Sequence, residues 1–390
     1  MSADFELLVI GGGPAGLSAV RGYRAAGGPG SVAIVGDEKR MPYLRPPLTK
    51  ELMRDEITED ELPLEDEEWL ARERVALVAG RAVALDPGAH RVTLSGGRTL
   101  TYGRCVLATG AEPTRLPVPG SDDPAVRVMR SLDDLRELRS RLRPGAAVIV
   151  IGSGFIGCEI AASLRRRGHP VALVSDEPSP NCGRLGEEAG ARIAAWLEEE
   201  GVVLHLGAAV DGIERRDHEL QVAAADASLS APVVVMATGV APRSELVAGA
   251  LAVHEGDGAV PVDSALRTAV PDLLAAGDVC LAHNEAAGRP LRVEHWGDAL
   301  GQGETAGRTA AGETAAWADV PGFWSTVGGR TLKYAAWGDG YDACRFEAHG
   351  DEAFAVWYGR DGRTVGVLAH ECDEAYDAGR ERIAEGAAWR

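Results

Sequence analysis

The feature that most constrains the fold of this 390-residue chain is a glycine-rich fingerprint that occurs twice. The two copies are Gly11-Gly12-Gly13-Pro14-Ala15-Gly16 and Gly152-Ser153-Gly154-Phe155-Ile156-Gly157. Each follows an apolar run, at residues 5–10 and 148–151. In a strand–turn–helix unit the first glycine allows the tight turn, the second lets the backbone approach a pyrophosphate, and the third lets helix and strand pack closely. Two copies therefore predict two dinucleotide sites, each with its phosphates at a helix N-terminus.

An acidic residue about 20 residues after each fingerprint is expected to bind a ribose hydroxyl. In the first unit Asp37 supplies it, after a strand predicted at residues 31–35. In the second unit the strand at 171–174 ends in Ser175-Asp176-Glu177, so the acid is displaced by one position. The alternative is that the glycines only make tight strand–helix turns and bind no nucleotide. This alternative explains two copies less well than it would explain one.

Length and composition indicate a multidomain globular protein. A chain of 390 residues exceeds what one core organises, so two or three domains are expected. A formal net charge of −19 disfavours nonspecific binding to nucleic acid or to an anionic membrane. A strand begins within a few residues of Met1 without a basic and apolar leader, and no apolar run reaches about 18 residues, so a cytoplasmic location is the default expectation.

The cysteines argue against thiol and metal chemistry. Six are scattered along the chain, with no pair at two-residue or four-residue spacing, so neither a redox disulfide nor a metal site is expected. No cysteine precedes residue 105. Cys105 and Cys158 lie in apolar surroundings and are most simply buried small hydrophobic residues.

The order of the motifs predicts nested domains. The first unit closes with a strand and the turn Ala108-Thr109-Gly110, and Ala237-Thr238-Gly239 closes the second in the same way. A third apolar segment at 273–276, followed by Gly277-Asp278, would return the chain to the first unit. Asp278 would accept hydrogen bonds from a sugar or ribityl chain, or alternatively cap a following helix.

The last part of the chain has the pattern of an antiparallel sheet rather than that of a nucleotide-binding unit. From Gly322 onward, residues 331–337, 343–348, 353–358 and 364–370 alternate like antiparallel strands, with a hairpin turn at 360–362. A helix is expected from about Asp373 to Ala387. Six of the eight tryptophans follow residue 290, and packing in the core of a small domain is the favoured role for most of them.

Several segments together resemble the FAD-dependent pyridine nucleotide oxidoreductases of the ferredoxin reductase type. They are Pro42 to Lys50, the Ala-Thr-Gly segments, Cys158-Glu159, Ala276-Gly277-Asp278, Glu294-His295-Trp296 and Phe323-Trp324-Ser325. Putidaredoxin and rhodocoxin reductases are type members of this family, and apoptosis-inducing factor is a relative. The resemblance spans nearly the whole chain, and Arg-Pro-Pro-Leu-Thr-Lys at 45–50 is its most specific part.

The resemblance implies an α/β fold like that of glutathione reductase. It would have two Rossmann-like nucleotide-binding domains, the second inserted in the first, and a small α+β C-terminal domain. The expected boundaries are 1–112 and 245–318 for a discontinuous FAD-binding domain, 113–244 for the NAD(P)H-binding domain, and 319–390 for the C-terminal domain.

The resemblance also assigns site residues by position. FAD would be held by Gly11, Gly13, Pro14, Ala15, Gly16, Asp37, Arg45, Pro47, Lys50, Val83, Ala108, Thr109, Gly110, Arg130, Gly277 and Asp278. The nicotinamide nucleotide would be held by Gly152, Gly154, Phe155, Ile156, Gly157, Glu159, Asp176, Glu177 and Gly239. The flavin would be lined further by Glu294, His295, Trp296 and Trp324.

Four of these residues are expected to act at the flavin: Lys50, Glu159, Phe155 and Trp296. Glu159 would pair with Lys50, because a desolvated lysine stays charged only beside a carboxylate; the alternative is that both lie on the surface. Phe155 would stack over the flavin and move aside for the nicotinamide, or else belong to the core. A helix opening near Trp296 would point its N-terminal dipole at the negative charge that develops on the flavin.

The expected function is an FAD-dependent reductase that passes electrons from NADH to a [2Fe-2S] ferredoxin serving an oxygenase or cytochrome P450. The alternatives are a redox-sensing FAD/NADH charge-transfer protein and a reductase of quinones or other small acceptors. NADH is preferred to NADPH because no arginine adjoins the end of the strand at 171–174 to hold a 2′-phosphate, and Arg184 is the only candidate in the vicinity. The candidate arginines for docking are Arg165 to Arg167, Arg330, Arg345 and Arg360, although the first three could simply solvate a helix end.

Overall fold

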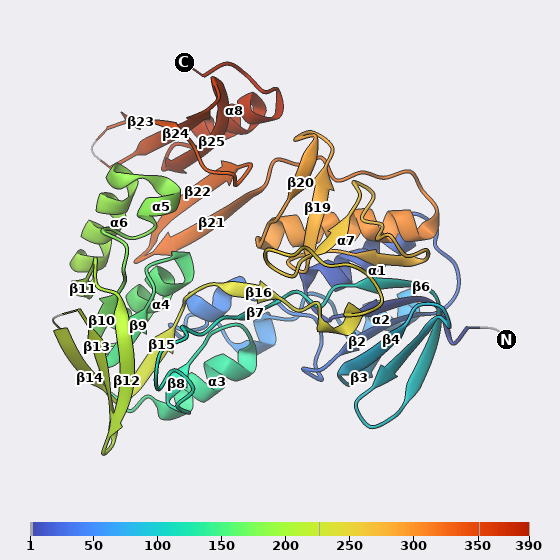
Figure 1. Ribbon diagram of the computed structural model, residues 1–390, viewed down its shortest axis with the longest axis horizontal. Helices are drawn as coiled ribbons and strands as arrows, with labels where there is room; N and C mark the ends of the chain where they lie inside the picture. The colour runs from blue at the N-terminus through green and yellow to red at the C-terminus, as the bar shows by residue number, and fades with distance from the viewer. Residues whose placement is uncertain (1–2, 226, 351, 390) are drawn as a thin grey trace.

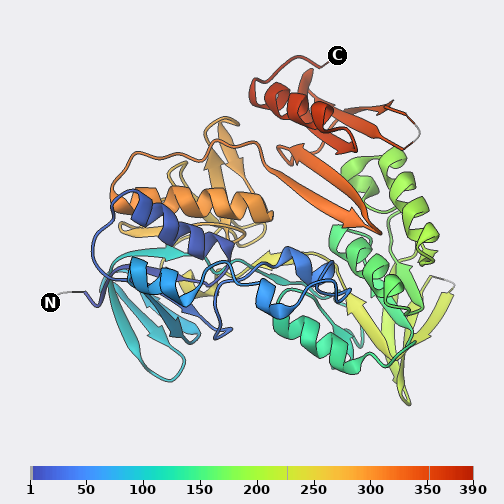
Figure 2. The same cartoon turned by 180° about the vertical axis from the view of Figure 1, so that it is seen from behind.

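The computed structural model describes residues 3–225, 227–350 and 352–389 (Figures 1 and 2). Two α/β domains lie side by side, the first built on a mixed sheet with a parallel core and the second on a parallel sheet, and a smaller antiparallel domain carries the C-terminus (Figure 1). The predicted fold class is confirmed, including the insertion of the second domain into the first.

The first domain is built on a seven-stranded sheet in the order β3–β2–β1–β6–β5–β4, with β18 added beside β6. Its strands are β1 (Phe5–Ile10), β2 (Val32–Gly36), β3 (Val75–Ala79), β4 (Ala82–Asp86), β5 (Arg91–Leu94), β6 (Thr99–Leu107) and β18 (Leu273–Ala275). The β18 segment pairs in parallel with β6, which is the return to the first unit that the sequence predicted. Leu7, Leu8 and Val9 are fully buried, because helices or a second layer cover both faces of a parallel sheet.

Helices α1 (Pro14–Ala25) and α7 (Trp296–Ala311) cover this sheet and pack tightly against each other (Figure 1). Glycines make their close approach possible, because a Cβ on Gly307 would lie 2.0 Å from the Ala19 carbonyl oxygen and one on Gly303 would lie 2.3 Å from that of Ala15. The remaining elements of this domain are α2 (Glu67–Glu73), β17 (Val260–Val262), β19 (Cys280–Asn284), β20 (Arg289–Leu291) and short 3₁₀ helices at Pro46–Thr49, Glu59–Glu61 and Glu245–Val247.

The second domain has a five-stranded parallel sheet in the order β11–β10–β9–β15–β8 and an antiparallel sheet β12–β13–β14. Its strands are β8 (Val126–Arg127), β9 (Val148–Ile151), β10 (Val171–Val174), β11 (Val203–His205), β12 (Val210–Arg216), β13 (Glu219–Ala224), β14 (Ala227–Ala231) and β15 (Val233–Met236). Its helices are α3 (Leu132–Arg141), α4 (Phe155–Arg166), α5 (Cys182–Leu185) and α6 (Glu187–Glu199).

The chain enters the second domain through β7 (Ala111–Pro113) and leaves it through β16 (Val240–Pro242). These two short strands pair with each other in antiparallel register, Val240 opposite Pro113 and Pro242 opposite Ala111. The two covalent connections between the nucleotide-binding domains therefore run side by side.

The C-terminal domain is a five-stranded antiparallel sheet in the order β21–β22–β25–β24–β23, followed by α8. Its elements are β21 (Gly322–Val327), β22 (Arg330–Ala336), β23 (Ala343–Ala348), β24 (Phe354–Arg360), β25 (Arg363–His370) and α8 (Asp373–Ala384). The sequence analysis missed β21. It also placed the end of α8 three residues too late, since Gly386 takes a positive φ of 60° beyond the helix end. The predicted hairpin turn is confirmed, with positive φ at Asp361 and Gly362.

The late tryptophans divide between core and surface. Trp317 and Trp337 are buried, as expected for a small core, and Trp357 is partly buried. Trp324 on β21 is the exception, with 50% of its surface exposed. In the described parts of the chain, no helix combines the length and the apolar character needed to cross a bilayer.

The glycine contact between α1 and α7 gives a stability prediction. A methyl group at Gly307 has no room, so Gly307→Ala forces the helices apart and costs about 1–3 kcal/mol. Gly301→Ala on the same helix is the matched control, because its Cβ meets only the end of the Asp319 side chain, at 3.4 Å. We expect a lower urea-unfolding midpoint for Gly307→Ala and an unchanged or higher one for Gly301→Ala. Equal midpoints in the two variants would contradict this account of the packing.

Candidate functional site

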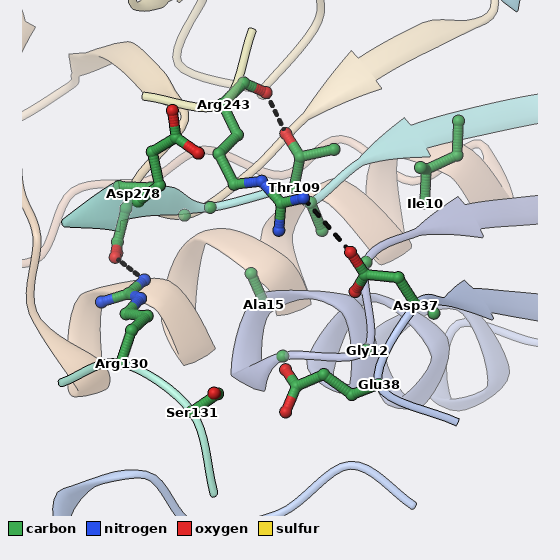
Figure 3. Close-up of a pocket in the computed structure, with 18 of the residues that line it drawn as sticks. Ile10, Gly12, Ala15, Asp37, Glu38, Thr109, Arg130, Ser131, Arg243 and Asp278 are labelled. Atoms are coloured by element: carbon green, nitrogen blue, oxygen red, sulfur yellow. Dashed lines mark hydrogen bonds and ion pairs between the residues drawn. The ribbon is translucent and has the colours of Figure 1, made fainter. Parts of the chain in front are cut away.

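A cavity of about 670 Å³ opens in the first domain, where β1, β2 and β6 end (Figure 3). Ligands of open α/β sheets bind at the carboxyl ends of the strands, and this volume is in the range of cofactor pockets. The lining includes Gly11 to Ala15, Asp37, Arg45, Val83, Ala108 to Gly110, Arg130, Gly277 and Asp278. The structure thus brings together most of the residues that the sequence assigned to FAD.

The first fingerprint fits a dinucleotide at this cavity. A Cβ on Gly11 would lie 2.0 Å from the Ala108 carbonyl oxygen, and one on Gly16 would lie 2.0 Å from that of Gly11. A Cβ on Gly12 or Gly13 would meet nothing within 4 Å. The glycine turn is therefore packed closely against the protein and open on the side of the cavity, where α1 begins at Pro14. That combination leaves a pyrophosphate free access to the helix N-terminus.

Two ion pairs span the cavity (Figure 3). Arg130 Nη2 donates to Asp278 Oδ2 at 2.6 Å, and Arg243 Nη2 donates to Asp37 Oδ2 at 3.2 Å. Asp278 precedes β19, so the alternative reading of this residue as a helix cap is wrong. Both predicted carboxylates therefore face the cavity and are held by guanidinium groups from other segments of the chain.

Arg45 lies deeper on the same wall. Its guanidinium donates to the Arg130 carbonyl oxygen at 2.9 Å and to Glu38 at 2.5 Å, and it lies over the ring of Tyr43. Burial raises the pKa of the Tyr43 hydroxyl, so the phenol stays neutral beside Glu38. This network fixes the Pro42 to Lys50 segment against the cavity.

The second fingerprint has the same steric pattern as the first. A Cβ on Gly152 would lie 2.4 Å from the Ala237 carbonyl oxygen and one on Gly157 would lie 2.0 Å from that of Gly152, whereas Gly154 is open. Helix α4 starts at Phe155, directly after the open glycine. The chain therefore contains two turns with one closely packed side and one open side, as two dinucleotides require.

The acidic end of β10 is ordered around Glu177. Ser153 Oγ lies 2.8 Å from Ser175 Oγ and 3.3 Å from Glu177 Oε2, and Glu177 Oε1 accepts the Gly183 amide at 3.0 Å. Asp176 is exposed. Of the two predicted acids, Glu177 is the one that contacts the fingerprint.

A buried polar cluster joins all three domains. Glu159 Oε2 accepts Lys50 Nζ at 2.7 Å and Thr49 Oγ1 at 2.5 Å, and Glu159 Oε1 accepts Ser325 Oγ at 2.7 Å. The exposed fractions of these residues are 5% for Lys50, 2% for Glu159, 4% for Thr49 and 1% for Ser325. The alternative that Lys50 and Glu159 are surface residues is therefore wrong.

An aromatic cluster lies beside these polar groups. The ring of Phe323 is 4.6 Å from that of Phe155 and 4.5 Å from that of His295. His295 Nδ1 is 3.1 Å from Asp298 Oδ2, which also accepts the Gly322 amide. The N-terminus of α7, the N-terminus of α4 and β21 thus meet at this point.

The structure separates the predicted flavin residues into two groups. One group lines the 670 Å³ cavity, and the other, which lies outside its lining, includes Pro47, Lys50, Glu294, His295, Trp296 and Trp324. Glu294 pairs with Arg292 on the surface, and Trp296 is only partly buried.

The proposed docking arginines all have partners. They are Arg165 with the His169 carbonyl, Arg166 with Glu200, Arg167 with Asp55, Arg330 with Glu199, Arg345 with Glu347, and Arg360 with Asp361. Arg165 also donates to the Glu200 carbonyl after α6, and Arg166 donates to the Gly328 carbonyl between β21 and β22, so both link α4 to neighbouring elements.

The expected burial of Cys105 and Cys158 is confirmed. All six are free, and Cys105, Cys158 and Cys280 are buried. Burial raises the pKa of each of these three thiols, which leaves them protonated and unreactive. Among the described residues, no group of His, Cys, Asp and Glu side chains is arranged to hold a metal ion.

The sequence analysis missed three residues that the structure places at the site. Arg243 faces Asp37 across the cavity, Ser325 bonds Glu159, and Phe323 joins Phe155 to His295. Phe323 and Ser325 belong to the segment Phe323-Trp324-Ser325, which carries part of the family resemblance. That resemblance is the only sequence signal for these two residues. For Arg243 the sequence carries no signal, because a charged residue after a short strand is ordinarily exposed.

Comparisons with known proteins show what this chain is similar to. A family model described as pyridine nucleotide-disulphide oxidoreductase matches residues 5–303. Rhodocoxin reductase from Rhodococcus erythropolis is 32% identical over 281 residues, which are 71% of this chain and 65% of that protein. The ferredoxin–NAD(+) reductase component of a biphenyl dioxygenase system from Paraburkholderia xenovorans is 34% identical over 276 residues, 70% of this chain and 67% of that protein.

A solved structure matches over almost the full length. A chain in the crystal structure of a covalent putidaredoxin reductase–putidaredoxin complex superposes with a TM-score of 0.91 at 27% identity. The alignment covers 99% of this chain and 94% of that chain, so the similarity includes the C-terminal domain.

The buried cluster gives a second prediction. Glu159→Ala leaves the buried Lys50 ammonium without its carboxylate partner and costs about 3–5 kcal/mol of stability. Replacing both charged partners, Lys50→Met with Glu159→Leu, recovers only part of that loss, because the buried hydroxyls of Thr49 and Ser325 still lose their acceptor. Glu313→Ala, which breaks the exposed ion pair between Arg308 and Glu313, costs at most about 1 kcal/mol. Urea titrations of the three variants test this order, and a Glu159→Ala midpoint equal to that of the Glu313 control contradicts it.

Proposed function

The chain belongs to the pyridine nucleotide-disulphide oxidoreductase family, and from this membership we propose its reaction. It is an FAD-dependent reductase that takes a hydride from NADH and passes electrons one at a time to a small iron–sulfur protein. The observation that carries the proposal is the buried Lys50–Glu159 pair, which links two domains that each hold an open glycine turn.

The first cavity is the proposed FAD site. When bound, FAD accepts two electrons as a hydride and releases them singly, which suits a one-electron acceptor. Asp37 would bind the ribose hydroxyls, the N-terminus of α1 the phosphates, and Asp278 the hydroxyls of the ribityl chain. Arg130, now paired with Asp278, lies where it can also meet a phosphate.

The second glycine turn is the proposed nicotinamide nucleotide site. The open Gly154 and the N-terminus of α4 would take the pyrophosphate. Phe155, the first residue of α4, is partly buried against Phe323 and would move aside for the nicotinamide ring. Glu159 would hold the Lys50 side chain in place through their 2.7 Å ion pair, which is buried beside this turn.

NADH is the proposed hydride donor, because Glu177 holds a fixed negative charge at the end of β10. Its two carboxylate oxygens contact Ser153 and the Gly183 amide, so the group cannot turn away from a ribose bound there. A 2′-phosphate at this position would meet a like charge, whereas a 2′-hydroxyl can donate to the carboxylate.

Two observations support an iron–sulfur protein as the electron acceptor: the names of the relatives and the exposed side chain of Trp324. One relative is named as a reductase of rhodocoxin and the other as a ferredoxin–NAD(+) reductase component. The matched segments span about two thirds of the lengths of these two proteins. Trp324, half exposed, adjoins Phe323 in sequence and offers an aromatic contact beside the Phe155–His295 cluster.

Rapid mixing of the flavin-loaded protein with NADH, followed by a [2Fe-2S] ferredoxin or by air, tests the proposal. We expect fast bleaching of the flavin band by NADH and reoxidation that depends on the ferredoxin and weakens with salt. A persistent long-wavelength band with slow reoxidation would instead support a redox-sensing protein. Fast, salt-independent turnover with a quinone alone would support a small-acceptor reductase, and a protein without flavin would refute all three.

A further prediction concerns the choice of nicotinamide nucleotide. Glu177→Ala removes the fixed charge beside Ser153, so the ratio of kcat/KM for NADH to that for NADPH falls by about tenfold, or 1.4 kcal/mol. Asp176→Ala, at an exposed neighbouring position, is the matched control and leaves the ratio unchanged. Equal ratios in wild type and Glu177→Ala would exclude Glu177 as the discriminating residue.

A further inference from the structure

Arg243 stands at the mouth of the first cavity, directly after β16 (Figure 3). Its main chain is fixed on both sides: its amide donates to the Gly110 carbonyl at 2.9 Å, and its carbonyl accepts Thr109 Oγ1 at 2.6 Å. Thr109 and Gly110 belong to the turn that closes the first nucleotide-binding unit. The backbone of Arg243 is therefore held against the cavity wall although the residue lies on a connection between domains.

The side chain of Arg243 reaches back across the cavity to the end of β2. Its only side-chain partner recorded among the described residues is Asp37, through Nη2 at 3.2 Å. A guanidinium group has five N–H donors, so most of the donors of Arg243 remain available. Its exposed fraction of 28% leaves these donors accessible to a ligand in the cavity.

Charge in the cavity favours a role toward an anion. The lining carries more carboxylates than guanidinium groups, and Arg45 and Arg130 are already paired with Glu38 and Asp278. A dinucleotide brings further negative charge in its pyrophosphate. A guanidinium with unused donors in the lining of the same cavity offsets that charge better than one already paired at short distance.

We propose that Arg243 is a binding residue for the adenosine diphosphate part of FAD. It orients the Asp37 carboxylate toward the ribose hydroxyls and covers the adenosine end of the bound cofactor with its guanidinium group. This inference rests on the proposed function only in taking FAD as the occupant of the first cavity.

The test compares FAD affinity in wild type and Arg243→Gln. Apoprotein is titrated with FAD, and binding is followed by quenching of flavin fluorescence, without NADH or acceptor. We expect the FAD dissociation constant to rise at least tenfold in Arg243→Gln and to be unchanged in Arg267→Gln, whose partner Asp263 lies outside the cavity. Asp37→Asn combined with Arg243→Gln should lose less than the sum of the two single effects, because the side chains act as one unit.

Melting of the apoproteins separates a binding role from a structural one. If Arg243→Gln lowers the apoprotein melting temperature but leaves the FAD dissociation constant unchanged, Arg243 is only a structural partner of Asp37 and the proposal is overturned. Loss of FAD affinity with a normal apoprotein melt supports it. A wild type that binds FAD but reduces no iron–sulfur protein would refute the proposed acceptor and leave this inference standing.

Discussion

The arrangement of the three domains depends on one buried carboxylate, that of Glu159. Its two oxygens accept Thr49 and Lys50 from the first domain and Ser325 from the C-terminal domain, while its own helix belongs to the second. A buried carboxylate that is shielded from water is tolerated only when it is paired with a cation and hydrogen-bonded. Each of these three donors must therefore stay in place. The proposed site for electron transfer is therefore assembled by the same bonds that fix the relative positions of the domains.

Much of the fold could be predicted because its strongest signals are local. The glycines of each fingerprint are required by contacts within one strand–turn–helix unit, such as that of Gly16 with the Gly11 carbonyl. The nested order followed from repeated closing turns, and the pairing of β18 with β6 confirmed it. The roles of individual site residues in binding and catalysis stay predictions, although the structure gathers most of the FAD set around one cavity.

What the sequence could not reveal depends on contacts between distant segments. The pairing of Arg243 with Asp37 joins residues on two different connections, and no spacing rule relates them. Glu177, and not Asp176, contacts the second fingerprint because its carboxylate bonds Ser153 and the Gly183 amide. Ser153 precedes Glu177 by 24 residues and Gly183 follows it by six. The strand β21 was missed because polarity does not follow burial along it: the apolar Trp324 is exposed, whereas the polar Ser325 is buried and bonded to Glu159.

The paired crossing strands β7 and β16 have a mechanical consequence. A domain on a single linker can rotate about every axis, but one attached by two hydrogen-bonded segments resists twisting and retains mainly one bending motion. Once the bonds of Glu159 to Lys50 and Ser325 are broken, the second domain should therefore swing mainly about the line of the β7–β16 pair. Because Arg243 follows β16 directly, the axis of that swing passes beside the adenosine end of the first cavity, so the proposed cofactor would lie near the part of the molecule that moves least.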